Sequence, residues 1–175
     1  MTAAYTVEDR EAACLLLHEL LHGAGFVTFT FGCNFSLCFG RMPRSVGGIG
    51  LPPEVRLELE AEWWFGERRG WEEKVLAMAP PGHVEPAEPV RAFELATLRW
   101  QEGAEIAQVG VEEGLLRLRF GNGRVLSALC HTEMGWGWSV QGSFGGASWS
   151  VVAEDDVLYA ASPLEDVGAA LRREG

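Results

Sequence analysis

Residues 55–65 read VRLELEAEWWF, and this stretch decides the fold class. Apolar and charged side chains alternate along it, which is the period of a β-strand with one face in a core and the other in water. The apolar side chains are Val55, Leu57, Leu59, Ala61, Trp63 and Phe65, and the polar ones are Arg56, Glu58, Glu60 and Glu62. The pattern predicts one long strand with a buried and a solvated face.

Strand patterns continue on both sides of this stretch. Phe26–Phe31 and Phe35–Phe39 predict a hairpin that turns near Cys33-Asn34, and the Gly- and Pro-rich segment Arg41–Pro53 predicts a loop. Asn122-Gly123 is a tight-turn signal. The second half predicts a meander with strands over Glu105–Val111, Leu115–Phe120, Arg124–Cys130, Met134–Val140, Ser148–Val152 and Val157–Ala161.

Helices are expected at three main places. Thr6 can cap a first helix that ends near His22, and Pro89 can begin a second that runs through Leu98. Ser162-Pro163-Leu164-Glu165 has the form of a capping box and predicts a short helix to about Arg173, and a shorter element is expected at Trp71–Met78. Helices and antiparallel strands in one chain predict an α+β fold.

The two halves of the chain have parallel patterns. Leu17-x-x-Leu20, Gly23-Ala24, Phe29-x-Phe31 and Leu37-x-Phe39-Gly40 run parallel to Leu95-x-x-Leu98, Gly103-Ala104, Val109-x-Val111 and Leu118-x-Phe120-Gly121. We therefore predict a pseudo-duplication of one helix-plus-antiparallel-sheet unit. The halves would be residues 1–80 and 91–175, joined by a Pro-rich linker over 81–90 and packed as one globule.

Composition and net charge limit the classes of partner that the chain can bind. The chain has 175 residues and a formal net charge of −11, which repels nucleic acid and anionic membrane surfaces and favours a basic partner. The four cysteines form no Cys-x-x-Cys pair, and no leader or membrane-spanning run is evident. These features predict a protein of the reducing cytoplasm without disulfides.

The run His18-Glu19-Leu20-Leu21-His22 matches the His-Glu-x-x-His pattern of zinc peptidases. On a helix His18 and His22 share one face, so both imidazoles could bind one zinc ion while Glu19 acts as general base. A third ligand would have to be His83, His131 or a downstream carboxylate, because the metzincin position falls on Thr28. A helical wheel instead places both histidines on the polar side, opposite an apolar stripe of Ala13, Leu16, Leu17, Leu20 and Leu21, as for ordinary surface histidines.

Two further groups could bind partners. Glu58, Glu60 and Glu62 would form a row of carboxylates that could receive a basic protein, or simply a solvated strand face. Trp136 and Trp138 would share a strand face with Met134 and Val140, as a stacking platform for a small ligand or as core.

The segment Gly103–Leu126, with Leu-x-Leu-x-Phe followed by Asn-Gly-x-Val-Leu, resembles small bacterial immunity-type β-meander proteins. The resemblance implies a protein that binds and occludes a cognate toxin, often of opposite charge, and transfers no contact residue. The sequence hypothesis is therefore a non-enzymatic binding protein without a cofactor, which engages a basic protein through Glu58, Glu60 and Glu62. The alternatives are a zinc hydrolase at His18, Glu19 and His22 and a small-ligand binder at Trp136 and Trp138.

Overall fold

The computed structural model describes residues 5–133 and 135–174 and has the predicted α+β class. Four helices and thirteen strands, mostly antiparallel, are present among these residues, and no helix there is long and apolar enough to cross a membrane. The elements up to residue 78 are β1 (Tyr5–Val7), α1 (Arg10–Leu21), β2 (Gly25–Phe31), β3 (Phe35–Gly40), β4 (Ser45–Val46), β5 (Ile49–Gly50), β6 (Glu54–Leu59), β7 (Trp63–Phe65) and α2 (Arg68–Met78). The elements after it are α3 (Ala87–Arg99), β8 (Ile106–Glu112), β9 (Leu115–Phe120), β10 (Val125–Leu129), β11 (Trp136–Phe144), β12 (Ala147–Glu154), β13 (Val157–Ser162) and α4 (Val167–Glu174).

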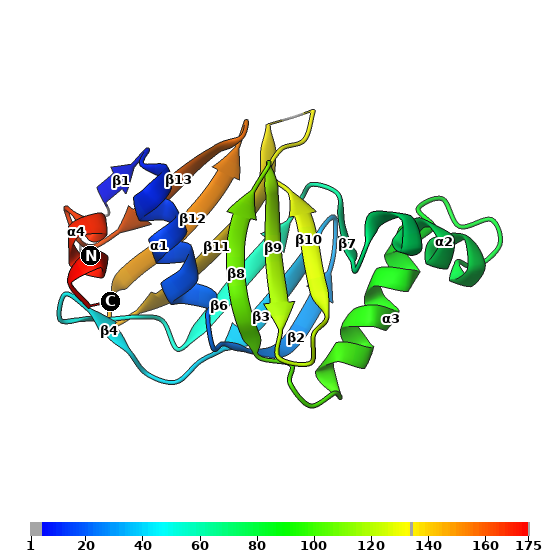
Figure 1. Cartoon of the computed structure of the whole chain (residues 1–175), viewed down its shortest axis with the longest axis horizontal. Coiled ribbons are helices and arrows are strands. Elements are labelled where there is room, and N and C mark those ends of the chain that lie inside the picture. Colours follow the sequence, from blue (N-terminus) through cyan, green and yellow to red (C-terminus); the bar gives the residue numbers. More distant parts are fainter. Residues whose placement is uncertain (1–4, 134, 175) are drawn as a thin grey trace.

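Two antiparallel sheets form the body of the molecule. The larger has seven strands in the order β1-β13-β12-β11-β6-β3-β2, and the smaller has four in the order β7-β10-β9-β8. Figure 1 shows α1 and the four-stranded sheet side by side in front of the seven-stranded sheet. The seven-stranded sheet therefore has an inner face, covered by these elements, and an opposite outer face.

The stretch that decides the fold forms two strands rather than one. β6 ends at Leu59 and lies between β3 and β11 in the seven-stranded sheet, whereas β7 begins at Trp63 and pairs with β10 in the other sheet. The prediction of one strand over 55–65 was therefore wrong at its centre. β6 buries alternate side chains, whereas all three side chains of β7 are buried.

The second half makes the reverse exchange. β10 pairs with β9 and β7 in the four-stranded sheet, and β11 then pairs with β6 in the seven-stranded sheet. The segment that joins β6 to β7 crosses the segment that joins β10 to β11, and we call this contact the crossing. Leu129 N–H donates to Glu62 O at 3.0 Å, and Ala61 N–H donates to Gly137 O at 2.8 Å. The first half thus supplies β7 to the four-stranded sheet, and the second half supplies β11, β12 and β13 to the seven-stranded sheet. Met134, where the sequence predicted the second Trp-bearing strand to begin, lies outside the described residues.

The two hairpins that precede the crossings have matching geometry. Phe26 pairs with Phe39 and Ile106 pairs with Phe120, and in both hairpins the register shifts at the residue that follows. Phe26 N–H donates to Ala104 O at 3.1 Å, and Ile106 N–H donates to Ala24 O at 2.9 Å. These reciprocal bonds are those expected if a two-fold axis relates the two hairpins. The matched registers agree with the parallel sequence patterns, while an origin by gene duplication stays a prediction.

Helix α1 packs as its helical wheel predicts. Leu16, Leu20 and Leu21 are fully buried, and His18 and His22 are exposed. A single cluster of buried side chains includes residues of both halves, among them Leu17 of α1, Leu57 of β6 and Val140 of β11.

Several element ends differ from the sequence prediction. Asp9, not Thr6, caps α1, because its carboxylate accepts from the N–H groups of Glu11 and Ala12, and Thr6 lies in β1. The last helix begins at Val167, where Asp166 accepts from Ala169 N–H at 2.8 Å, so the expected capping box at Ser162 is not formed. The predicted loop 41–53 contains the small hairpin of β4 and β5.

Arginines hold β7 and the two helices beside it. The guanidinium groups of Arg91, Arg68 and Arg124 lie 5.1, 4.4 and 4.5 Å from the ring centroids of Trp63, Trp64 and Phe65, respectively. Attraction between a cation and an aromatic face adds to the burial of these rings. All three rings of the exchanged strand are thereby fixed against α2, α3 or β10.

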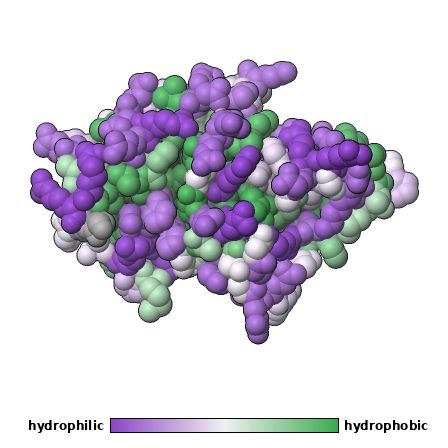
Figure 2. Space-filling view, in the orientation of Figure 1, coloured by the Kyte–Doolittle hydropathy of each residue, from purple (hydrophilic) through white to green (hydrophobic). Residues whose placement is uncertain are grey.

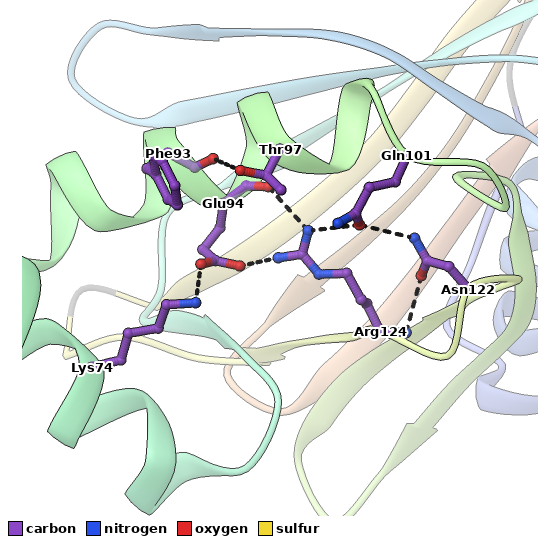
Figure 3. A network of polar contacts seen from close by, with 7 residues as sticks. All are labelled: Lys74, Phe93, Glu94, Thr97, Gln101, Asn122 and Arg124. Atoms are coloured by element: carbon purple, nitrogen blue, oxygen red, sulfur yellow. Dashed lines mark hydrogen bonds and ion pairs between the residues drawn. The ribbon is translucent and has the colours of Figure 1, made fainter.

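A buried carboxylate joins α2, α3 and β10. Glu94 of α3 is only 7% exposed in its side chain and pairs with Lys74 of α2 and with Arg124, the residue before β10 (Figure 3). Arg124 also reaches the Glu94 carbonyl oxygen at 3.3 Å and Gln101 Oε1 at 3.5 Å. A buried charge in this position is stable only while its partners are present.

We predict that Gly137→Ala strongly destabilises the protein. A Cβ atom at Gly137 would lie 2.7 Å from the backbone nitrogen of His131, and closer still to the carbonyl group of Cys130. Because two backbones meet there, the expected loss in the free energy of unfolding by urea is about 3 kcal/mol or more. Gly110→Ala is the matched control, since a Cβ there meets nothing within 4 Å and should change that free energy by less than about 1 kcal/mol. Equal stability of the two variants would contradict this close approach of Gly137 to the backbone at residues 130–131.

We also predict that Glu94→Ala costs about 2 kcal/mol of unfolding free energy, because it leaves Arg124 partly buried without its carboxylate. Glu73→Ala removes an exposed ion pair with Arg69, whose side chains are 68% and 92% exposed, and should cost less than about 0.5 kcal/mol. Chemical denaturation of both variants measures the difference. Equal losses would show that Glu94 is no more than a surface charge.

Candidate functional site

The two histidines of the His-Glu-x-x-His run lie together on the exposed side of α1. Their rings stack with centroids 4.6 Å apart and planes 14° from parallel. Burial lowers the pKa of His18, the nearby His22 lowers it further, and Glu19 opposes both effects. These side chains are thus a pair of surface imidazoles with one neighbouring carboxylate.

Glu19 is engaged by arginines of the segment that follows β3. Its Oε2 lies 3.0 Å from Arg44 Nη2, whereas its Oε1 lies 3.8 Å from His18 Nδ1. Arg41 donates to the backbone oxygen of Glu19. A general base must be able to take a proton from a bound water, and an ion pair with arginine opposes that role.

The remaining histidines lie elsewhere in the fold. His83 is in the α2–α3 connection, where its Nδ1 is 3.0 Å from Glu85 O, and His131 pairs with Asp156 at 3.0 Å. Across residues 5–133 and 135–174, no three His, Cys, Asp or Glu side chains gather as a metal site would require. The sequence motif supplies two histidine ligands, and the part of the chain that the structure describes adds no third.

The outer face of the seven-stranded sheet carries the second candidate site. No helix of the described chain covers it in Figure 1, and side chains that point to it are exposed or half-buried. The registers align these side chains in rows across the strands. One row is Ser36, Glu58, Ser139, Val152 and Tyr159, the next is Cys38, Arg56, Gln141, Ser150 and Ala161, and a further pair is Trp136 with Glu154.

The three predicted carboxylates are placed differently from one another. Glu58 is half-buried on the outer face and accepts a hydrogen bond of 2.8 Å from Ser36 Oγ. Glu60 follows β6, is exposed, and donates its N–H to Gly137 O at 3.1 Å. Glu62 pairs with Arg68 at 2.7 Å. The expected single row is therefore absent, because the chain leaves the sheet between Glu58 and Glu62.

The two tryptophans of β11 do not share an accessible face. The register shifts between Trp136 and Trp138, so Trp138 is 1% exposed in the core while Trp136 is 48% exposed on the outer face. Trp138 donates to Cys130 Sγ at 3.4 Å, and Trp136 donates to Glu154 Oε1 at 2.9 Å. The predicted common face was wrong because the period of two is broken at Gly137.

A shallow depression of about 490 Å³ lies on the outer face. Its lining includes Glu54, Arg56, Gln141 and Ser143, with the small side chains of Ser148, Ser150 and Ala161. Cys38 lies beside it in the row of Arg56. Burial and a hydrogen bond with Glu54 raise the pKa of the Cys38 thiol to about 11, so it stays protonated at neutral pH and is a weak nucleophile.

Sequence reasoning missed three groups that the structure brings to these surfaces. Glu154 joins Trp136 through the β11–β12 register, and Arg44 joins Glu19 from a loop. Arg117 and Arg119 lie with His18 and His22 around a second hollow. The pattern Leu116-Arg117-Leu118-Arg119 could have marked the two arginines as one exposed strand face, although not their proximity to α1.

Comparison with protein-family models, with curated proteins and with solved structures gives no match.

We predict that protein purified without a histidine tag binds less than stoichiometric zinc, because only two ligand types converge and Arg44 holds Glu19. Metal analysis after incubation with a modest excess of zinc measures this, with the His18→Ala, His22→Ala variant as control. One zinc ion per chain in the wild type, lost in that variant, would restore the zinc hydrolase hypothesis.

Proposed function

We propose that this chain is a non-enzymatic binding protein that holds a basic protein segment on the outer face of the seven-stranded sheet. The observation that carries the proposal is an open sheet face that bears several carboxylates and one exposed tryptophan, whose indole donates to one of them. A face left uncovered by the rest of a fold is available for a partner, and charge decides which partner it favours.

Charge on this surface favours a cationic partner. Glu54, Glu58 and Glu154 point to the outer face and Glu60 follows directly after β6, whereas Arg56 is the one cationic side chain in the described cross-strand rows. The chain as a whole carries a formal net charge of −11, which adds long-range attraction for a basic protein.

Trp136 supplies an aromatic anchor. Its indole is 48% exposed, and its N–H is held by Glu154 at 2.9 Å, so little conformational freedom is lost when a partner covers the ring. Tryptophan is one of the residue types that contribute most to protein interfaces. Arginine or lysine of a partner can stack on such a ring while it pairs with the neighbouring carboxylate.

The depression on the same face has room for a protruding side chain. Its small side chains, Ser148, Ser150 and Ala161, leave a volume of about 490 Å³ beside Glu54. Lysine and arginine have long stems with charged ends, and they suit a shallow hollow lined by one carboxylate. We therefore infer a basic loop or helix as the bound segment.

Occlusion of a basic toxin is the form of this function that the resemblance of Gly103–Leu126 implies. The absence of a Cys-x-x-Cys pair supports a cytoplasmic location for it. A zinc hydrolase is the alternative that the His-Glu-x-x-His run suggests. The ion pair between Glu19 and Arg44 disfavours it. A Trp-lined ligand platform is disfavoured because Trp138 is buried.

We predict that the Glu58→Lys, Glu60→Lys variant binds a lysine-rich peptide about tenfold more weakly than wild type at low salt, because it reverses two charges on the proposed surface. The matched control is Glu102→Lys, Glu165→Lys, which changes net charge equally at exposed positions away from the outer face. Screening and distance limit its expected effect to about threefold or less. Calorimetric titration measures both affinities.

Glu58→Lys also removes the hydrogen bond from Ser36, so Trp136→Ala is tested in parallel as a variant that keeps all the carboxylates. We expect it to weaken peptide binding and to remove the fluorescence change on binding. Equal weakening by the two charge-reversed variants, together with unchanged binding by Trp136→Ala, would contradict the proposed surface.

A further inference from the structure

The second hollow lies between α1 and the exposed side of the four-stranded sheet, on the face opposite the outer face. α1 runs alongside β8, where Arg10 donates to Val111 O at 3.1 Å (Figure 1). The hollow has a volume of about 430 Å³, within the range of small-molecule sites. The lining side chains used below are His18, His22, Gln108, Arg117 and Arg119, with Gly110 beneath them.

Two unpaired arginines lie at this hollow in an acidic protein. Arg117 and Arg119 are exposed and make no ion pair or side-chain hydrogen bond with residues 5–133 or 135–174. The chain has 25 acidic residues and only 14 Lys and Arg, and several of those arginines pair with carboxylates elsewhere. Glu112 is the one carboxylate among the residues that line the hollow. The hollow is therefore electropositive, although the chain as a whole carries a negative net charge.

The histidines add two donors at the same place. The stacked rings of His18 and His22 border the hollow from α1, while the arginines border it from β9. Figure 2 shows strongly hydrophilic residues in the middle of this face, over the four-stranded sheet, with hydrophobic surface beside them. Two guanidinium and two imidazole groups around one hollow can donate hydrogen bonds to several oxygens of one anion.

Gly110 lines the hollow without a side chain. It pairs with Arg117 in the β8–β9 register, and a Cβ there would meet nothing within 4 Å. Glycine inside a strand weakens the strand, and it often marks a place where a ligand approaches the backbone. The empty position lies beside the arginine that would hold the ligand.

We propose that this hollow binds a small molecule that carries a phosphate monoester. A carboxylate has one charge and two oxygens, whereas a phosphate monoester has up to two charges and three free oxygens. The phosphate therefore matches the donors of two arginines and two histidines better. The rest of the molecule would lie over Gly110, beside Gln108. A long nucleic acid is disfavoured because the net charge of the chain repels it. This site is independent of the outer face.

The test titrates wild-type protein with inorganic phosphate, with a hexose phosphate and with a phosphoserine peptide, and follows the imidazole resonances by NMR. We expect saturable shifts of His18 and His22 with the hexose phosphate, while His83 and His131, which lie outside the hollow, stay unchanged. Tighter binding of the phosphoserine peptide than of the hexose phosphate would overturn the assignment to a small molecule.

Two variants separate the site from general charge. Arg117→Gln, Arg119→Gln should weaken hexose phosphate binding by roughly tenfold or more, whereas Arg69→Gln, Arg173→Gln, with the same net charge, should leave it unchanged. Gly110→Val keeps both arginines but places a side chain in the hollow. It should weaken the binding of the hexose phosphate more than the binding of inorganic phosphate, without lowering the stability of the protein. No saturable binding of any probe to wild type, or equal affinity in the two arginine variants, would overturn the proposal.

Discussion

The rest of the structure depends on one contact between two backbones, where the segment that follows β6 crosses the segment that joins β10 to β11. Gly137 O accepts from Glu60 and Ala61, and Leu129 N–H donates to Glu62 O. The absence of a side chain at Gly137 lets the β10–β11 connection fold back past its own residues 130–131, where a Cβ would collide with the backbone. With the crossing in place, β6 and β11 complete one sheet while β7 and β10 complete the other.

Both candidate sites follow from this exchange, because each is built from the two halves together. On the outer face, Glu58 of the first half lies in one row with Ser139 of the second, and Trp136 lies farther along β11. In the second hollow, His18 and His22 come from α1, and the arginines come from β9. Neither half contains a complete site. The buried stripe of α1 fixes the helix, and its polar face is thereby directed to the hollow.

Local pattern was sufficient for much of the fold. Alternation predicted the hairpins β2–β3 and β8–β9, and the apolar stripe of α1 predicted which residues are buried. The pairing of β7 with β10 could not be predicted, since the alternation of apolar and charged residues continues as far as Trp63, past the point where the chain leaves the seven-stranded sheet. The separation of Trp136 from Trp138 depends on a register shift. Likewise, helical spacing found the two histidines but not Arg44 or Arg117, which approach from distant parts of the chain.

Dividing the chain in the exposed α2–α3 connection, between Gly82 and His83, tests the interlocked halves most directly. Each fragment would be purified alone and then mixed with the other in equal amounts, with circular dichroism and amide NMR as readouts. The account predicts that neither fragment unfolds cooperatively alone, and that the mixture regains the spectra of the intact chain as an equimolar complex. A fragment that folds alone as a stable monomer with a native-like spectrum would contradict it.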